Sequence, residues 1–330
     1  MIITRTPFRI SFFGGGTDLK DYYLKYGGAV LSTTINKYLY ITCRHMPPYW
    51  DYKHQLIYGS KNERVNLINE IDHPSIRETM RFLEIDYGLD LHYNTDIPAK
   101  SGMGSSSSFT VGLLHSLYGL NGKLVSKRKL ATEAIHIEQE LIKEAVGDQD
   151  QIAAAFGGLN HIVFKTDGSF QANPMTISDK RIEELNNHLV LVFTGFQRFA
   201  TDIEKDKILH IEDNFSNLHK MAVITNQAIE ILDSNIDICE FGSLMNENWN
   251  LKKTLSDKVS TLAIDEIYET GIKNGAIGGK ILGAGGGGFI LFFVKPKNKE
   301  RLLASLNSLI NIPFGFDKLG SQVIYYRDGE

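Results

Sequence analysis

A loop interrupted by glycines at residues 98–108, Pro-Ala-Lys-Ser-Gly-Met-Gly-Ser-Ser-Ser-Ser, constrains the fold more than any other segment of the chain. An alternating strand pattern at residues 89–93 precedes this loop. After it, Phe109, Leu113 and Leu117 recur at helical spacing. The pattern therefore predicts a strand, a glycine-rich turn and a helix in direct succession.

Glycine and serine residues give the loop the chemistry of a phosphate site. Gly102 and Gly104 let the backbone come close to a ligand. The first N–H groups of the following helix, together with the positive end of its dipole, attract phosphate oxygens. The serine hydroxyls could add hydrogen bonds or a ligand for Mg²⁺. The alternative is a flexible linker whose serines only cap the helix.

A second glycine cluster occupies residues 278–289. Its Gly-Lys pair, which ends at Lys280, is followed by isoleucine and lacks the upstream glycine of a Walker loop. A G-x-G-x-x-G match that begins at Gly283 runs into a strand pattern at 289–294, whereas a dinucleotide fingerprint opens a helix. A nicotinamide-dependent oxidoreductase is therefore disfavoured. We interpret the cluster as backbone packed closely against a ligand or against the first loop, with a tight hairpin as the alternative.

One carboxylate falls on the apolar face of a predicted helix at residues 127–146. Glu138 is spaced from Ala134 and Leu141 so that all three share one face. A buried carboxylate needs a partner, which here would be a cation or Mg²⁺. An internal salt bridge is the alternative.

Two further acidic residues, Asp148 and Asp150, lie in the next segment, at residues 147–158. Asp148 could cap a helix, with Gln151 reaching back to complete a capping box, and Asp150 would then lie in the first turn. There it could orient a substrate hydroxyl and accept its proton. On these residues alone, structural capping and catalysis are evenly matched.

An early strand is broken by three glycines between Arg9 and Asp18. Asp18 could accept hydrogen bonds from two sugar hydroxyls, and Arg9 could neutralise a phosphate or hold Asp150 ionised. A bare turn with a surface ion pair is the alternative.

The chain has 330 residues, which favours two domains, predicted here at 1–180 and 181–330. The strand patterns at 189–193, 289–294 and 322–326, with a helix near 300–309, predict an α+β second domain. The net charge of -4 favours neither a nucleic-acid nor a membrane partner, so an anionic substrate must be held by a few placed groups. No apolar run approaches a membrane span, and a cytoplasmic protein is expected.

Taken in order, the segments resemble the superfamily of galactokinase, homoserine kinase, mevalonate kinase and phosphomevalonate kinase, or GHMP kinases. Three motifs carry the resemblance, at residues 7–18, 98–108 and 280–288. It implies an ATP- and Mg²⁺-dependent kinase with an N-terminal domain like the second domain of ribosomal protein S5 and a ferredoxin-like C-terminal domain. The family's Gly-x-x-Asp-Gln pattern identifies Asp150, rather than Asp148, as the catalytic residue.

The resemblance and the local chemistry together give an expected role to each site residue. The expected catalytic residues are Asp150 and Arg9, and the expected Mg²⁺ ligands are Glu138 with Ser105 or Ser106. Nucleotide binding is assigned to Lys100, Gly102, Gly104, Ser105, Ser106 and Ser107. Substrate binding is assigned to Asp18, Gly15, Gly16, Thr17, Gly285, Gly286 and Arg198. Arg198 is the candidate for a phosphate on the substrate itself, because a guanidinium binds that group in bidentate fashion.

The expected substrate follows from a comparison of these motifs with those of individual kinases within the superfamily. Galactokinases carry Glu-His where this chain has Gly15-Gly16, which leaves room for a longer or phosphorylated sugar. The motifs are most similar to those of bacterial kinases that phosphorylate the anomeric hydroxyl of D-glycero-D-manno-heptose 7-phosphate on the way to GDP-heptose and surface polysaccharide. The partner is then a small sugar phosphate, and a homodimer is allowed. A kinase for another sugar, fucose-like or galactose-like, and a non-catalytic relative that binds nucleotide and sugar are the alternatives.

Overall fold

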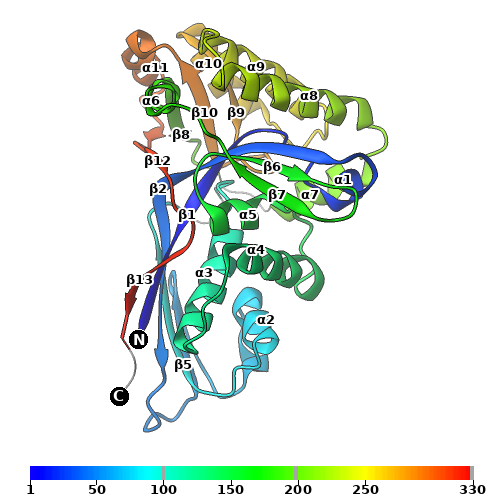
Figure 1. Cartoon of the computed structure of the whole chain (residues 1–330). Helices are drawn as coiled ribbons and strands as arrows, with labels where there is room; N and C mark the ends of the chain where they lie inside the picture. The colour runs from blue at the N-terminus through cyan, green and yellow to red at the C-terminus, as the bar shows by residue number, and fades with distance from the viewer. Residues whose placement is uncertain (99–100, 197–199, 328–330) are drawn as a thin grey trace.

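The computed structural model of the chain describes residues 1–98, 101–196 and 200–327. Its strands form two sheets, and helices pack against both of them (Figure 1). The α+β class predicted from the sequence is confirmed.

The larger sheet combines strands from both ends of the chain. Its path runs β13-β1-β2-β5-β3-β4, while β12 and β6 pair with β2, and β7 pairs with β6. The neighbours are antiparallel except for β3 and β5. Its strands are β1 (Ile2–Phe13), β2 (Gly28–His45), β3 (His54–Tyr58), β4 (Lys61–Val65), β5 (Leu89–Thr95), β6 (Asn160–Phe164), β7 (Phe170–Pro174), β12 (Phe316–Asp317) and β13 (Gln322–Tyr326).

The helices of the first half lie mostly on one side of this sheet (Figure 1). Helix α3 is buried on two sides: Phe109 and Leu113 belong to the core cluster that includes the sheet, and Val111 and Leu114 to the cluster shared with α4 and α5. This burial holds the helix start rigidly. These helices are α1 (Lys20–Tyr26), η1 (Ile68–Glu70), α2 (Pro74–Phe82), α3 (Ser105–Leu120), α4 (Lys127–His136), the π-helical turn η2 (Ile137–Leu141) and α5 (Gln149–Phe156).

The second sheet is antiparallel in the order β11-β8-β10-β9. Its strands are β8 (Leu189–Phe193), β9 (Ala276–Ile281), β10 (Phe289–Val294) and β11 (Ile310–Asn311), and the accompanying helices are α6 (Asp179–Asn187), α7 (Ala200–Leu209), α8 (Phe215–Leu232), α9 (Cys239–Lys253), α10 (Leu262–Lys273), η3 (Pro296–Asn298) and α11 (Lys299–Ser305). Across the described ranges, no helix is both long and apolar enough to cross a bilayer.

Three predicted elements differ from the structure. The strand at 322–326 exists, but it pairs with β1 in the larger sheet instead of joining the second one. The helix predicted near 300–309 is α11, which ends at Ser305. The helix predicted over 127–146 ends early, because its last turn widens into η2 and Lys143 then adopts a positive φ of 64°.

Candidate active site

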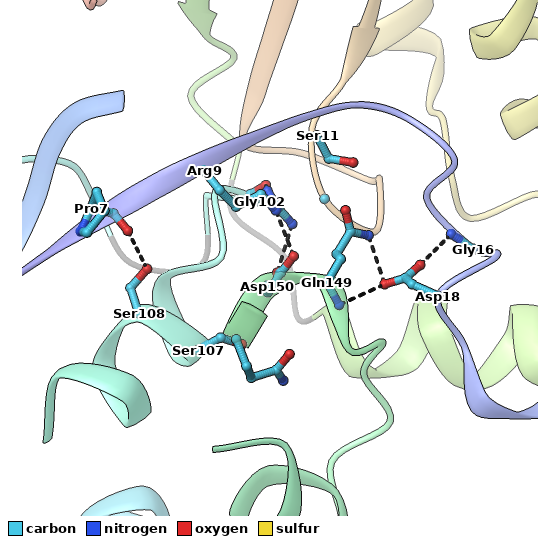
Figure 2. Close-up of polar contacts among 12 residues, drawn as sticks. Pro7, Arg9, Ser11, Gly16, Asp18, Gly102, Ser107, Ser108, Gln149 and Asp150 are labelled. Atoms are coloured by element: carbon cyan, nitrogen blue, oxygen red, sulfur yellow. Dashed lines mark hydrogen bonds and ion pairs between the residues drawn. The ribbon is translucent and has the colours of Figure 1, made fainter. Parts of the chain in front are cut away.

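The candidate active site is a cavity of about 330 Å³, a volume typical of small-molecule sites. The end of β1, the first turn of α3 and the first turn of α5 meet at it (Figure 2). The segment after β9 and helices α7 and α9 complete the lining of the cavity. Both halves of the chain therefore contribute side chains to one space.

The first turn of α3 presents its backbone to this cavity. Gly104 precedes the helix in the left-handed conformation, with φ 74°, and its carbonyl accepts the first helical hydrogen bond, from Ser108 N at 2.8 Å. The Ser108 hydroxyl donates to Pro7 O at 3.0 Å, which ties the helix start to β1 (Figure 2). The predicted nucleotide contacts Gly102, Gly104, Ser105, Ser106 and Ser107 all line the cavity.

The two glycine segments pack directly against each other. A Cβ added to Gly102 would lie 2.4 Å from Leu282 O, and one added to Gly288 would lie 2.2 Å from Ser101 O. No side chain larger than hydrogen fits at either position. This confirms the interpretation that the cluster at 278–289 packs closely against the first loop.

Arg9 and Asp150 form a bidentate ion pair. Arg9 Nε lies 2.7 Å from Asp150 Oδ1, and Arg9 Nη2 lies 2.8 Å from Oδ2 (Figure 2). Arg9 Nη1 donates to Gly102 O at 2.6 Å. Only 5% of the arginine side chain is exposed, so the surface-pair alternative is wrong for Arg9. The pair fixes the orientation of the Asp150 carboxylate beside the turn that opens α3.

Asp18 lies buried on the other side of the α5 start. It accepts hydrogen bonds from Gly16 N at 2.8 Å and from Gln149 Nε2 at 2.9 Å (Figure 2). Burial raises the pKa of Asp18 to about 6, and the negative charges of Glu204 and Asp150 add to this effect. Asp18 therefore gains a proton more readily than an ordinary carboxyl. The protonated group can donate a hydrogen bond to a ligand hydroxyl, and the ionised group can accept one.

The raised pKa predicts that Asp18 makes stability depend on pH. An unfolded carboxyl titrates near 3.8, whereas the folded one titrates at about 6, so the folded chain holds the proton more tightly. The free energy of unfolding should fall by up to about 3 kcal/mol as pH rises through this window. Asp18→Asn should remove the Asp18 share of that decline and leave the share due to the buried Glu138, measured by urea unfolding across the window.

The exposed Asp51 provides a matched control for this experiment. Asp51→Asn should keep the wild-type pH profile, because this side chain is exposed and removed from the site. Identical profiles for wild type and Asp18→Asn would contradict the raised pKa of Asp18.

Glu138 is fully buried, as its position on the apolar face predicts. Its Oε2 accepts from Ser107 Oγ at 2.9 Å and from Gln151 Nε2. Burial raises its pKa to about 7. Within the described ranges no ion pair involves Glu138, so the salt-bridge alternative is wrong there, and Oε1 has no donor.

The surroundings of Glu138 fit a magnesium ion. A buried carboxylate oxygen without a donor, next to a serine hydroxyl, offers the oxygen ligands that Mg²⁺ prefers. No cluster of three or more acidic, histidine or cysteine side chains that could hold a metal is present among the described residues. The ion would therefore take its other ligands from water and substrate phosphates.

The predicted capping box at the start of α5 is wrong. Asp148 makes no capping hydrogen bond, because its carboxylate accepts from Tyr23 OH at 2.7 Å and from Gln139 Nε2. Gln151 donates to Glu138 instead of reaching back to Asp148. Asp150 nevertheless lies in the first turn, as predicted.

Two predicted contacts lie elsewhere, and two others fall outside the part of the chain that the structure describes. Thr17 is fully buried, and its hydroxyl donates to Gly14 O at 2.8 Å, which stabilises the turn. Gly286 N donates to Val259 O at 2.8 Å, and Gly286 does not line the cavity, in contrast to Gly15, Gly16 and Gly285. Lys100 and Arg198 lie outside the described residues.

Sequence reasoning missed several residues that line the cavity. Lys207 and Lys252 come from helices α7 and α9, and Gln149 bonds to Asp18. No local pattern marks these three positions. Lys280, in contrast, adjoins the glycine cluster, and its location there could have identified it.

Two family models match the chain. A model of the GHMP kinase N-terminal domain matches residues 73–158, and a model of the GHMP kinase C-terminal domain matches residues 228–311. The first range contains α3, Glu138 and Asp150, and the second contains the glycine cluster.

Individual relatives include sugar kinases. D-glycero-alpha-D-manno-heptose 7-phosphate kinase of Campylobacter jejuni is 32% identical over 319 residues, covering 92% of this chain and 93% of the relative. The bifunctional fucokinase/GDP-fucose pyrophosphorylase of Arabidopsis thaliana is 29% identical over 66% of this chain and 21% of that longer protein. The crystal structure of a D-glycero-D-manno-heptose 1-phosphate kinase from Bacteroides thetaiotaomicron superposes with a TM-score of 0.82 at 25% identity, covering 99% of this chain and 100% of that one.

Proposed function

The chain belongs to the GHMP kinase family and is a phosphotransferase that acts on a sugar hydroxyl, and we propose that it transfers the γ-phosphoryl group of ATP to the C1 hydroxyl of D-glycero-D-manno-heptose 7-phosphate. The observation that carries the chemistry is the Arg9–Asp150 pair beside the first turn of α3. The product would be the 1,7-bisphosphate. The matched ranges, each within one predicted domain, support an ATP-binding domain at 1–180 and a second domain at 181–330, from which β12 and β13 return to the sheet of the first.

Asp150 is proposed to orient the attacking hydroxyl and accept its proton. Each of its oxygens accepts one hydrogen bond from Arg9 and retains a lone pair for the sugar. As the C1 oxygen bonds to the γ-phosphorus, the bond to the bridging oxygen breaks and ADP leaves. The transition state is loose, so the carboxylate contributes mainly through its fixed placement.

The first turn of α3 is proposed to hold the nucleotide phosphates. The N–H groups from Gly102 to Ser107 lie where an anion gains from the helix dipole. Glu138, with Ser105 or Ser106, would hold Mg²⁺, which when bound neutralises charge on the phosphates. Asp18, Gly15 and Gly16 would face the sugar.

The identity of the sugar rests on the relatives and on space in the cavity. The name of the Campylobacter relative specifies heptose 7-phosphate, whereas the name of the Bacteroides structure specifies heptose 1-phosphate. The name of the Arabidopsis relative specifies fucose. A Cβ added to Gly15 would be in ordinary contact with Gln149 Nε2 at 3.6 Å, so glycine leaves to a substrate the space that a side chain would occupy here. We favour the 7-phosphate because that relative has the higher sequence identity, 32% against 25% for the heptose 1-phosphate kinase.

A substrate panel tests this assignment. ADP release should be measured with heptose 7-phosphate, heptose 1-phosphate, free heptose, fucose and galactose, with ATP and Mg²⁺ at saturation. We expect kcat/KM for the 7-phosphate to exceed that for each free sugar by at least about tenfold. The free sugars lack the phosphate that cationic side chains of the cavity could bind. If a free sugar turns over equally well, the specific substrate is wrong although the kinase family stands.

A further inference from the structure

Three buried lysines from the second half of the chain line one wall of the cavity. They are Lys207 on α7, Lys252 on α9 and Lys280 on β9, and the residues are 6%, 4% and 2% exposed. We call this set the lysine wall. The carboxylates of Asp18 and Asp150 line the same cavity.

Two of these ammonium groups have no carboxylate partner among the described residues. Lys280 Nζ donates to Ser11 O and Phe12 O, each at 2.9 Å. Lys252 Nζ donates to Ile281 O at 3.2 Å and to Gly283 O. An ammonium has three donors, so each lysine keeps one N–H beyond these carbonyl contacts. A buried cation that faces a cavity without a counter-charge is costly unless a ligand supplies an anion.

Lys207 differs from the other two because, among the described residues, its Nζ makes no hydrogen bond to a loop or strand. Its Nζ lies 2.9 Å from Glu204 Oε1, one turn earlier on α7. This pair uses one donor and leaves two. Lys207 can therefore be replaced without releasing the backbone carbonyls that Lys252 and Lys280 hold.

The pKa values of Lys252 and Lys280 are lowered, which agrees with repulsion between the ammonium groups of the lysine wall. Burial, together with the positive charges of Arg9 and Lys207, lowers the pKa of Lys280 to about 7. Burial also lowers the pKa of Lys252, with Lys280 and Lys207 as additional causes. A bound dianion would relieve this repulsion and restore the charge of each ammonium.

We propose that the lysine wall binds the phosphate that the sugar substrate already carries, as distinct from the phosphates of the nucleotide. This inference rests on the proposed function, since it assumes a phosphorylated sugar. The nucleotide phosphates have backbone donors of their own at the start of α3, which lines the same cavity. Glu204, the partner of Lys207, acts electrostatically on Asp18, which places this end of the wall near the proposed sugar site. The lysines would thus select phosphorylated over free sugars.

Lys207→Met tests the proposal, with steady-state kinetics for the sugar phosphate, the parent sugar and ATP. We expect KM for the sugar phosphate to rise about 10- to 100-fold, as for loss of a charge-assisted hydrogen bond. KM for the parent sugar and for ATP should not change. Lys207→Arg should restore much of the affinity. The matched control is Lys205→Met, an exposed position on the same helix, which should behave as wild type.

The outcomes separate this inference from the proposed function. Absence of wild-type turnover with any sugar phosphate would refute the proposed function before a variant is measured. Wild-type turnover with no change in Lys207→Met would refute only the lysine wall. A rise in KM for ATP alone would assign the lysines to the nucleotide, and an equal rise for both sugars would indicate a structural role. Lys252→Met, if it folds, should reproduce the selective loss.

Discussion

Asp150→Asn is expected to lower kcat by about 10²- to 10⁴-fold without weakening nucleotide binding. Asparagine keeps the shape of the side chain, but it cannot take the hydroxyl proton and it loses one of the two charged bonds with Arg9. The nucleotide phosphates are proposed to bind the first turn of α3, which this change leaves intact. Turnover from coupled ADP release and affinity from calorimetry with a non-hydrolysable ATP analogue would measure both quantities.

Asp148→Asn is the matched control for this prediction. Asp148 is buried and lies two positions earlier, but its carboxylate contacts Tyr23 and Gln139 instead of the cavity. The control should retain kcat, even where it lowers stability. If Asp150→Asn turns over as fast as the control, Asp150 is not the acting group.

Gly102→Ala is expected to destabilise the fold by about 3 kcal/mol and to impair nucleotide binding. Two physical costs add at this position. The residue has a φ of 78°, where alanine costs about 1 kcal/mol, and the new Cβ would lie 2.4 Å from Leu282 O. Relief of that contact must move one glycine segment away from the other, at a cost of about 1–3 kcal/mol. Because the same segment lines the proposed phosphate site, we expect weaker binding of the ATP analogue.

Gly122→Ala separates these two costs. Gly122 has a similar φ of 65°, but an added Cβ meets nothing within 4 Å. This variant should lose only about 1 kcal/mol of unfolding free energy and should bind nucleotide normally. Equal losses in the two alanine variants, measured by denaturant unfolding, would show that contact between the glycine segments does not limit the site.

The elements that carry strong local patterns are predictable from sequence. The strand at 89–93 and the helix after the serine run appear as β5 and α3, because alternation and helical spacing reflect burial on a nearby face. The burial of Glu138 follows from the same spacing. The capping box at Asp148 fails because Tyr23, distant in sequence, bonds its carboxylate more directly. Local rules cannot include such a competitor.

Sequence order alone identifies the glycine loops, the candidate base and the buried acid, since each depends on residue types that are close together in the chain. The partners of these groups depend on the folded chain. Arg9 and Asp150 are 141 positions apart, and Lys280 and Ser11 are 269 apart, yet each pair is in contact. The lysine wall has no local signature, because side chains on α7, α9 and β9 converge only when the helices and the second sheet pack together. The charge balance of the cavity is therefore a property of that packing.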